Sequence, residues 1–132
     1  ATMTHGSRGK RLGPTIVVHA LPILDQLMGD VEPDVQKALA WAYRSLAAID
    51  RAAVTAALRT HTGQAVAADD GNRAWVIRDA LAKLDPADAD PLRDLLRGIR
   101  RRRDAAPTSP AAAVAAAFGP MPDPSAMPEP PL

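Results

Sequence analysis

The sequence lacks cysteine altogether and is poor in aromatic residues. Its 132 residues include two tryptophans, one tyrosine and one phenylalanine. The absence of cysteine excludes disulfide bonds, thiolate catalysis and cysteine-ligated metal sites. The scarcity of aromatic side chains argues against a single-strand nucleic-acid binder that stacks successive bases on exposed rings.

Net charge and long apolar runs are lacking as well. The formal net charge is +1, so no global field attracts polyanions and any electrostatic attraction must be local. The longest apolar stretch, TIVVHALPILDQLMG, is interrupted by His19, Pro22 and Asp25, which makes it too short and too broken to span a bilayer. The first residues are polar and do not have the pattern of a secretory signal. These features predict a cytoplasmic protein with no membrane partner.

The first apolar pattern, from Thr15 onward, has the spacing of a helix. One face of this helix would carry Val17, Leu21, Leu24 and Met28. Gly29 marks its end, and Pro22 predicts a kink or a later start. A short strand over residues 15–18 is the alternative, because β-branched residues cluster there. Helix is favoured because the sequence offers no second strand to pair with this one.

The longest pattern predicts one helix of about 30 residues, at 1.5 Å per residue roughly 45 Å long, over residues 33–62. Pro33 suits the first helical position and Gly63 the end. Its apolar stripe consists of Val35, Leu39, Ala42, Leu46, Ile49, Ala53 and Ala57. Alternatively, Asp50 caps a second helix and splits the element in two.

Two shorter helices are expected after this element. Asn72 would cap the first, which ends near residue 84. Asp90 and Pro91 would begin the second, whose core face is Leu92, Leu95, Leu96 and Ile99. The intervening DPADAD segment has the opening spacing of a calcium loop but lacks its glycine and final glutamate, so it is interpreted as a turn.

The predicted fold is all-α. A small bundle of three to four helices occupies residues 15–104, preceded by a flexible basic arm over residues 1–14. Residues 105–132 are rich in proline and alanine and are expected to form an extended tail. Within that tail, only Ala111–Phe118 has the composition of a short helix.

The two tryptophans stand apart from the apolar stripes of their helices. Trp41 lies on the side of Lys37 and Arg44, and Trp75 lies away from the apolar side of the next helix. Tryptophan is enriched at interface hot spots, so both are candidates for binding a protein partner. The tail adds the apolar candidates Val114, Phe118 and Leu132. The alternative is that each helix has two buried sides and the indoles belong to the core.

A cluster of arginines is the strongest local charge. Its members are Arg93, Arg97, Arg100, Arg101, Arg102 and Arg103. One interpretation is the solvated C-terminal end of a helix, where the helix dipole favours cations. The other is a site that binds phosphate or an acidic surface.

The residues nominate no catalytic, metal-binding or cofactor-binding site. His5, His19 and His61 are far apart and have no metal-ligand spacing, and no nucleophile stands in a known catalytic motif. Catalysis by this chain alone is therefore not expected.

The function predicted from these features is that of a non-catalytic accessory or assembly subunit of a larger protein complex. It would dock by its helix faces and by a tail that the partner orders. The alternative is a small DNA- or RNA-binding protein that uses the arginines of residues 93–103. A self-assembling helical coat protein, and hence a homo-oligomer, is a third interpretation.

Overall fold

The computed structural model describes residues 2–102 and 104–118, with backbone only for residues 2–14. This part of the chain contains six α-helices, one 3₁₀ helix and no strand. The elements are α1 (Thr2–Leu27), α2 (Pro33–Ala47), α3 (Arg51–Ala68), α4 (Gly71–Ala80), η1 (Leu81–Lys83), α5 (Pro86–Leu96) and α6 (Pro110–Phe118). The all-α prediction is confirmed, and the strand alternative for residues 15–18 is wrong.

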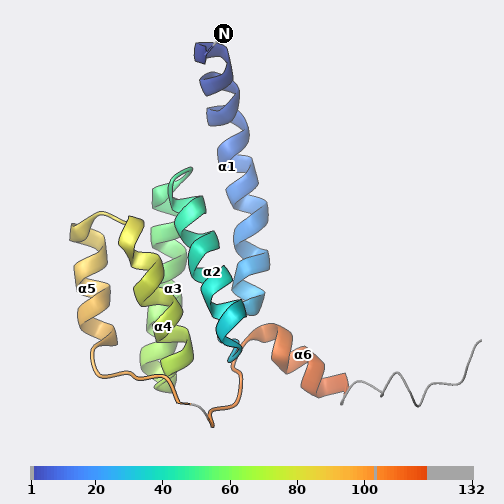
Figure 1. The fold of residues 1–132 in the computed structure, drawn as a ribbon, viewed down its shortest axis with the longest axis vertical. Coiled ribbons are helices and arrows are strands. Elements are labelled where there is room, and N and C mark those ends of the chain that lie inside the picture. The colour runs from blue at the N-terminus through green and yellow to red at the C-terminus, as the bar shows by residue number, and fades with distance from the viewer. Residues whose placement is uncertain (1, 103, 119–132) are drawn as a thin grey trace, which may run out of the picture.

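Helix α1 is longer than its apolar pattern. It runs through Pro22 and includes residues 2–14, which the sequence assigned to a flexible arm. In Figure 1 its N-terminal part extends past the other helices. Val17 and Met28 are fully buried, as their spacing predicts, and Gly29 follows the helix end with a positive φ of 102°.

The predicted long helix of residues 33–62 is two helices, so the alternative with a break at Asp50 is correct. The Asp50 backbone is not helical, and its side chain accepts from the backbone N–H of Ala53 at 3.1 Å. Restarting the helix changes which residues face inward. Buried positions in α3 are Val54, Thr55, Leu58, His61, Thr62 and Ala65, whereas Ile49 of the predicted stripe is exposed. Gly63 does not end α3, which continues to Ala68.

The next two helices begin earlier than predicted. Asp70, not Asn72, caps α4 and accepts from the N–H of Arg73. Helix α5 starts at Pro86, so Pro91 lies inside it. It ends at Leu96, and Gly98, with φ of 84°, turns the chain away.

The helices form two layers. Helix α2 packs against α1, α3 and α4, and α3 packs against α4 and α5. In Figure 1, α2 and α4 lie in front of α3. The core between the layers includes Leu39, Tyr43, Leu58, Ile77, Leu81 and Leu96. This arrangement leaves the outer side of α2 facing solvent, whereas on α4 only Trp75, Arg78 and Asp79 are even partly exposed.

The chain after α5 crosses below the bundle to α6, which packs against α1 (Figure 1). Helix α6 contains the Ala111–Phe118 segment, for which a short helix was predicted. Leu132 and Arg103 lie outside the described residues. Among the residues that are described, no helix is both long and apolar enough to cross a membrane. The proposed boundaries at residues 14 and 104 stay predictions.

Candidate functional site

Trp41 lines an apolar surface groove between α1 and α2. Its side chain is 65% exposed, so the outward orientation predicted for it is confirmed. The groove has a volume of about 520 Å³ and is also lined by Leu24, Leu27, Asp34, Val35, Ala38, Leu39 and Ala42. An indole that keeps this much exposed apolar surface beside a groove can stack on a flat ligand.

Two cations flank Trp41 along α2. Lys37 precedes it by four residues and Arg44 follows it by three, which places all three on one side of the helix. The guanidinium of Arg44 forms an ion pair with Asp79 of α4, with 3.3 Å between Nη1 and Oδ1. The outer side of α2 therefore combines an aromatic surface with positive charge.

Trp75 differs from Trp41, because part of its ring packs against the core. For Trp75 this agrees with the alternative left open by the sequence, in which the helix has two buried sides. The guanidinium of Arg101 lies over its ring, 4.2 Å from the centroid, in a cation–π contact.

Only part of the arginine cluster lies at a helix end, because Arg93 is in the last turn of α5 and Arg97 is its C-cap. Helix α5 stops at Leu96, so Arg100, Arg101 and Arg102 lie in the loop that follows. Leu95, predicted to be core, is 56% exposed. With α4 and α5 this loop forms a pocket of about 510 Å³, lined by Arg78, Arg93, Asp94, Arg97, Gly98, Ile99, Arg100 and Arg101. We refer to it as the arginine pocket.

Contacts with α4 hold the loop of the arginine pocket in place. Arg78 donates from Nη1 to the carbonyl oxygens of Leu96, at 3.2 Å, and Ile99, at 3.0 Å. Burial lowers the pKa of Arg78, although an arginine keeps its charge in proteins. A β-carbon on Gly71 would overlap the carbonyl of Arg100, so only glycine permits this close approach.

Most arginines of the cluster already have acidic or aromatic partners. Arg93 pairs with Asp90 at 3.1 Å and Arg97 with Asp94 at 2.8 Å. Arg102 pairs with Asp69 at 2.8 Å. Within the part of the chain that the structure describes, Arg100 has no ion-pair partner.

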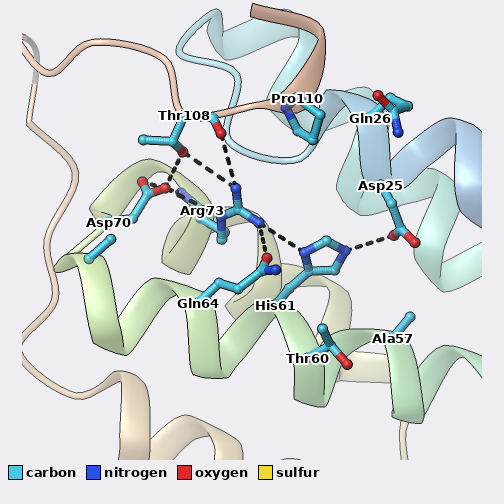
Figure 2. Close-up of a pocket in the computed structure, with 11 residues that line it drawn as sticks. Asp25, Gln26, Ala57, Thr60, His61, Gln64, Asp70, Arg73, Thr108 and Pro110 are labelled. Atoms are coloured by element: carbon cyan, nitrogen blue, oxygen red, sulfur yellow. Dashed lines mark hydrogen bonds and ion pairs between the residues drawn. The ribbon is translucent and has the colours of Figure 1, made fainter. Parts of the chain in front are cut away.

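A second polar pocket, of about 540 Å³, lies between α1, α3 and the segment before α6 (Figure 2). Its floor is a chain of hydrogen bonds between side chains. His61 lies 2.7 Å from Asp25 through Nε2 and 3.0 Å from Arg73 through Nδ1. Arg73 also contacts Gln64 at 2.6 Å and the Asp70 carboxylate at 3.3 Å. Because a guanidinium only donates, Nδ1 of His61 must accept, and its Nε2–H donates to Asp25.

This network ties separate elements to one another. Tyr43 of α2 donates from its hydroxyl to Asp25 at 2.7 Å, and the Thr108 hydroxyl donates to Asp70. Burial, and then the Asp25 carboxylate, raise the pKa of Tyr43 far above its usual value. The network thereby fixes α1, α2, α3, α4 and Thr108 relative to one another. Sequence reasoning missed it, because the contacts that join its separate elements link residues as far as 36 and 38 positions apart.

The tail residues proposed to bind a partner are on the surface where they are described. Val114 is 54% and Phe118 is 86% exposed. The roles of these residues, of both tryptophans and of the arginines stay predictions, as does the absence of catalytic, metal and cofactor sites.

Comparison with known proteins gives one match. The family model described as DNA alkylation repair enzyme matches residues 2–84. No curated protein and no solved structure matches the chain. The matched residues include α1 to η1, and with them the Trp41 groove, Lys37 and Arg44, and they stop before Arg93.

The predicted role as a non-catalytic accessory subunit is wrong. The match over residues 2–84 points to a family of DNA repair enzymes instead. It favours the alternative prediction, that of a nucleic-acid-binding helical protein, over docking to a larger protein complex.

Proposed function

Because the chain belongs to the DNA alkylation repair enzyme family, we propose that it recognises alkylated duplex DNA through the Trp41 groove. One observation carries this proposal. Trp41 is a largely exposed indole on an apolar groove, one turn from Lys37 and from Arg44, and all three lie within the residues that match the family.

The chemistry of an alkylated base suits this groove. Alkylation of a ring nitrogen gives the base a positive charge and weakens its pairing, which lowers the cost of extruding it from the duplex. A cation over an indole face gains about 0.5–2 kcal/mol. The groove volume of about 520 Å³ lies within the range of small-ligand sites, and Asp34 adds a carboxylate to its lining.

Lys37 and Arg44 would contact backbone phosphates on either side of the extruded base. Phosphate contacts supply affinity and register without reading sequence. The ion pair with Asp79 holds the Arg44 side chain across α2 and α4, so less of its motion is lost on binding. In this division of roles the cations bind DNA generally, and Trp41 selects the alkylated base.

The hydrogen-bond network of Figure 2 would support the groove from behind. Asp25, held by Tyr43 and His61, directly follows Leu24, which lines the groove. Fixing Asp25 against α2 and α3 therefore fixes the α1 wall of the groove.

The test compares the affinity for a duplex carrying one N-methylated purine with that for the unmodified duplex. Trp41→Ala should reduce the preference for the methylated duplex by roughly 2- to 30-fold, the range expected for losing a cation–π contact. Trp41→Phe should retain part of it. Val66→Ala, which shortens an exposed apolar side chain on α3, is the matched control.

Turnover is measured as release of label from a duplex whose N-methyl group is labelled. The assay detects release of the methyl group as a one-carbon product and release of the whole methylated base. Equal affinity of the unchanged protein for both duplexes would overturn the proposal. So would a Trp41→Ala protein that keeps the full preference for the methylated duplex.

A further inference from the structure

Seven of the eight residues that line the arginine pocket, all except Arg78, lie beyond the residues that match the family, and the pocket is separate from the Trp41 groove. Five of the eight residues that line it are arginines, and one, Asp94, is acidic. Asp94 is engaged by Arg97 in an exposed pair three residues apart. Exposed pairs of this kind are weak, so a phosphate can replace the carboxylate.

The pocket is organised before any ligand binds. Arg78 holds the carbonyls of Leu96 and Ile99, and Arg101 stacks on Trp75. Gly71 lets the backbone at Arg100 lie directly against the start of α4. A loop held by these contacts loses little freedom on binding, which leaves more of the interaction energy for affinity.

The pocket and the Trp41 groove are connected across the outer side of α2 and α4. Arg44, one turn from Trp41, reaches Asp79 of α4. Trp75, under Arg101, lies one turn from Asp79 on the same side of α4. With helices packed 8–10 Å apart, the two features are separated by two helix spacings, roughly 20 Å.

We infer that the arginine pocket binds phosphodiester groups of the duplex that flanks the alkylated base. The inference rests on the proposed function, which identifies duplex DNA as the partner, and it adds a second DNA contact to the one at the Trp41 groove. At about 3.4 Å per base pair, a separation of roughly 20 Å places this contact about six base pairs from the base at Trp41. Arginine forks match phosphate oxygens in geometry and in charge.

The test is the salt dependence of binding to an unmodified 20-base-pair duplex. Arg97→Ala combined with Arg100→Ala should weaken binding and reduce the slope of log K against log salt by about 1 to 2, because each phosphate contact adds about 0.9. The ratio of affinities for methylated and unmodified duplexes should not change. Duplexes that end within three base pairs of the lesion on both sides should not distinguish the variant from the unchanged protein.

The matched control is Arg51→Ala with Arg59→Ala. These exposed arginines of α3 pair with Asp85 and Asp88, and their removal alters the net charge equally. An unchanged slope in the Arg97/Arg100 variant, or an equal loss in the control, would overturn the inference. The remaining outcome is that the Arg97/Arg100 variant shows the reduced salt slope while the unchanged protein shows no preference for the methylated duplex. This outcome would refute the proposed function alone.

A second measurement separates DNA from free phosphate as the ligand. Binding is titrated with sodium phosphate and with sodium chloride at matched ionic strength. If the pocket holds the DNA backbone, the two salts should weaken DNA binding equally. Much stronger competition by phosphate, abolished in the Arg97/Arg100 variant, would show that the pocket is built for a free phosphate group and would overturn the inference.

Discussion

Arg73 donates from Nη1 to Nδ1 of His61 over 3.0 Å, so two basic side chains are in direct contact inside the protein. Both are almost fully buried. The contact is favourable because His61 is neutral and offers a lone pair to the guanidinium. The charge of Arg73 is balanced instead by Asp70, whose carboxylate is also buried.

Arg73→Met should destabilise the protein by about 3–5 kcal/mol, because it leaves the Asp70 carboxylate buried without its cation. Adding Asp70→Asn should recover part of this loss, since the uncompensated charge is removed. Urea denaturation followed by circular dichroism measures both changes. Arg51→Met, which breaks an exposed pair with Asp85, should cost under about 1 kcal/mol. A similar cost for both arginines would contradict the role assigned to Asp70.

Tyr43 should make stability fall at high pH. Its pKa is raised in the folded state, whereas in the unfolded chain it ionises near pH 10. The folded state therefore keeps a proton that the unfolded state loses. Above about pH 10 the free energy of unfolding should drop by up to about 1.4 kcal/mol per pH unit, and Tyr43→Phe should remove this contribution.

The measurement is direct because Tyr43 is the only tyrosine. Phenolate absorbance near 295 nm should remain low while the protein stays folded and rise together with unfolding. Phenolate formation near pH 10 in protein that retains its helical circular dichroism would contradict the buried hydrogen bond to Asp25.

The parts of the fold that could be predicted depend on contacts close in sequence. The spacing of Val17 and Met28 placed them correctly on a buried face, because helix periodicity is a local property. The sequence did not decide whether the helix breaks at Asp50, because an aspartate that caps a helix and one inside a helix differ only in backbone conformation. The start of α5 was misplaced because Asp85-Pro86 and Asp90-Pro91 carry the same signal.

The candidate site depended more on tertiary structure. Trp41 was placed outside the core from its helix face alone. For Trp75 the helix face alone did not show that the ring is partly buried, because the loop that carries Arg101 returns to cover it, and helix periodicity does not predict the path of a loop. The Asp25–His61–Arg73 contacts join three helices, and in a single sequence nothing links residues so far apart.

Asp50 should contribute to stability as the N-cap of α3. Its side chain accepts from the N–H of Ala53 at 3.1 Å, and replacing such a cap by alanine costs about 0.5–2 kcal/mol. Asp50→Asn should lose much less, because asparagine caps almost equally well. Thermal and urea unfolding compare the three proteins. Equal stability of Asp50→Ala and the unchanged protein would show that α2 and α3 can join without the cap.

Two glycines in helices provide an opposed pair of substitutions. A β-carbon on Gly63 meets nothing within 4 Å, so Gly63→Ala should stabilise α3 by about 0.5–1 kcal/mol through its higher helix propensity. A β-carbon on Gly71 would overlap the carbonyl of Arg100. Gly71→Ala must therefore push the loop at Arg100 and Arg101 off α4, and the contact of Arg101 with Trp75 should be lost.

The displaced loop can be distinguished from general unfolding. In a Trp41→Phe background, Trp75 is the only indole, so its fluorescence and its quenching by acrylamide report on the cover that Arg101 provides. Gly71→Ala should increase quenching and lower DNA affinity while most helical circular dichroism remains, whereas Gly63→Ala should change neither. Unchanged quenching and affinity in Gly71→Ala would contradict this prediction. They would mean that α4 shifts to make room for the β-carbon and that the loop keeps its place without the close approach at Gly71.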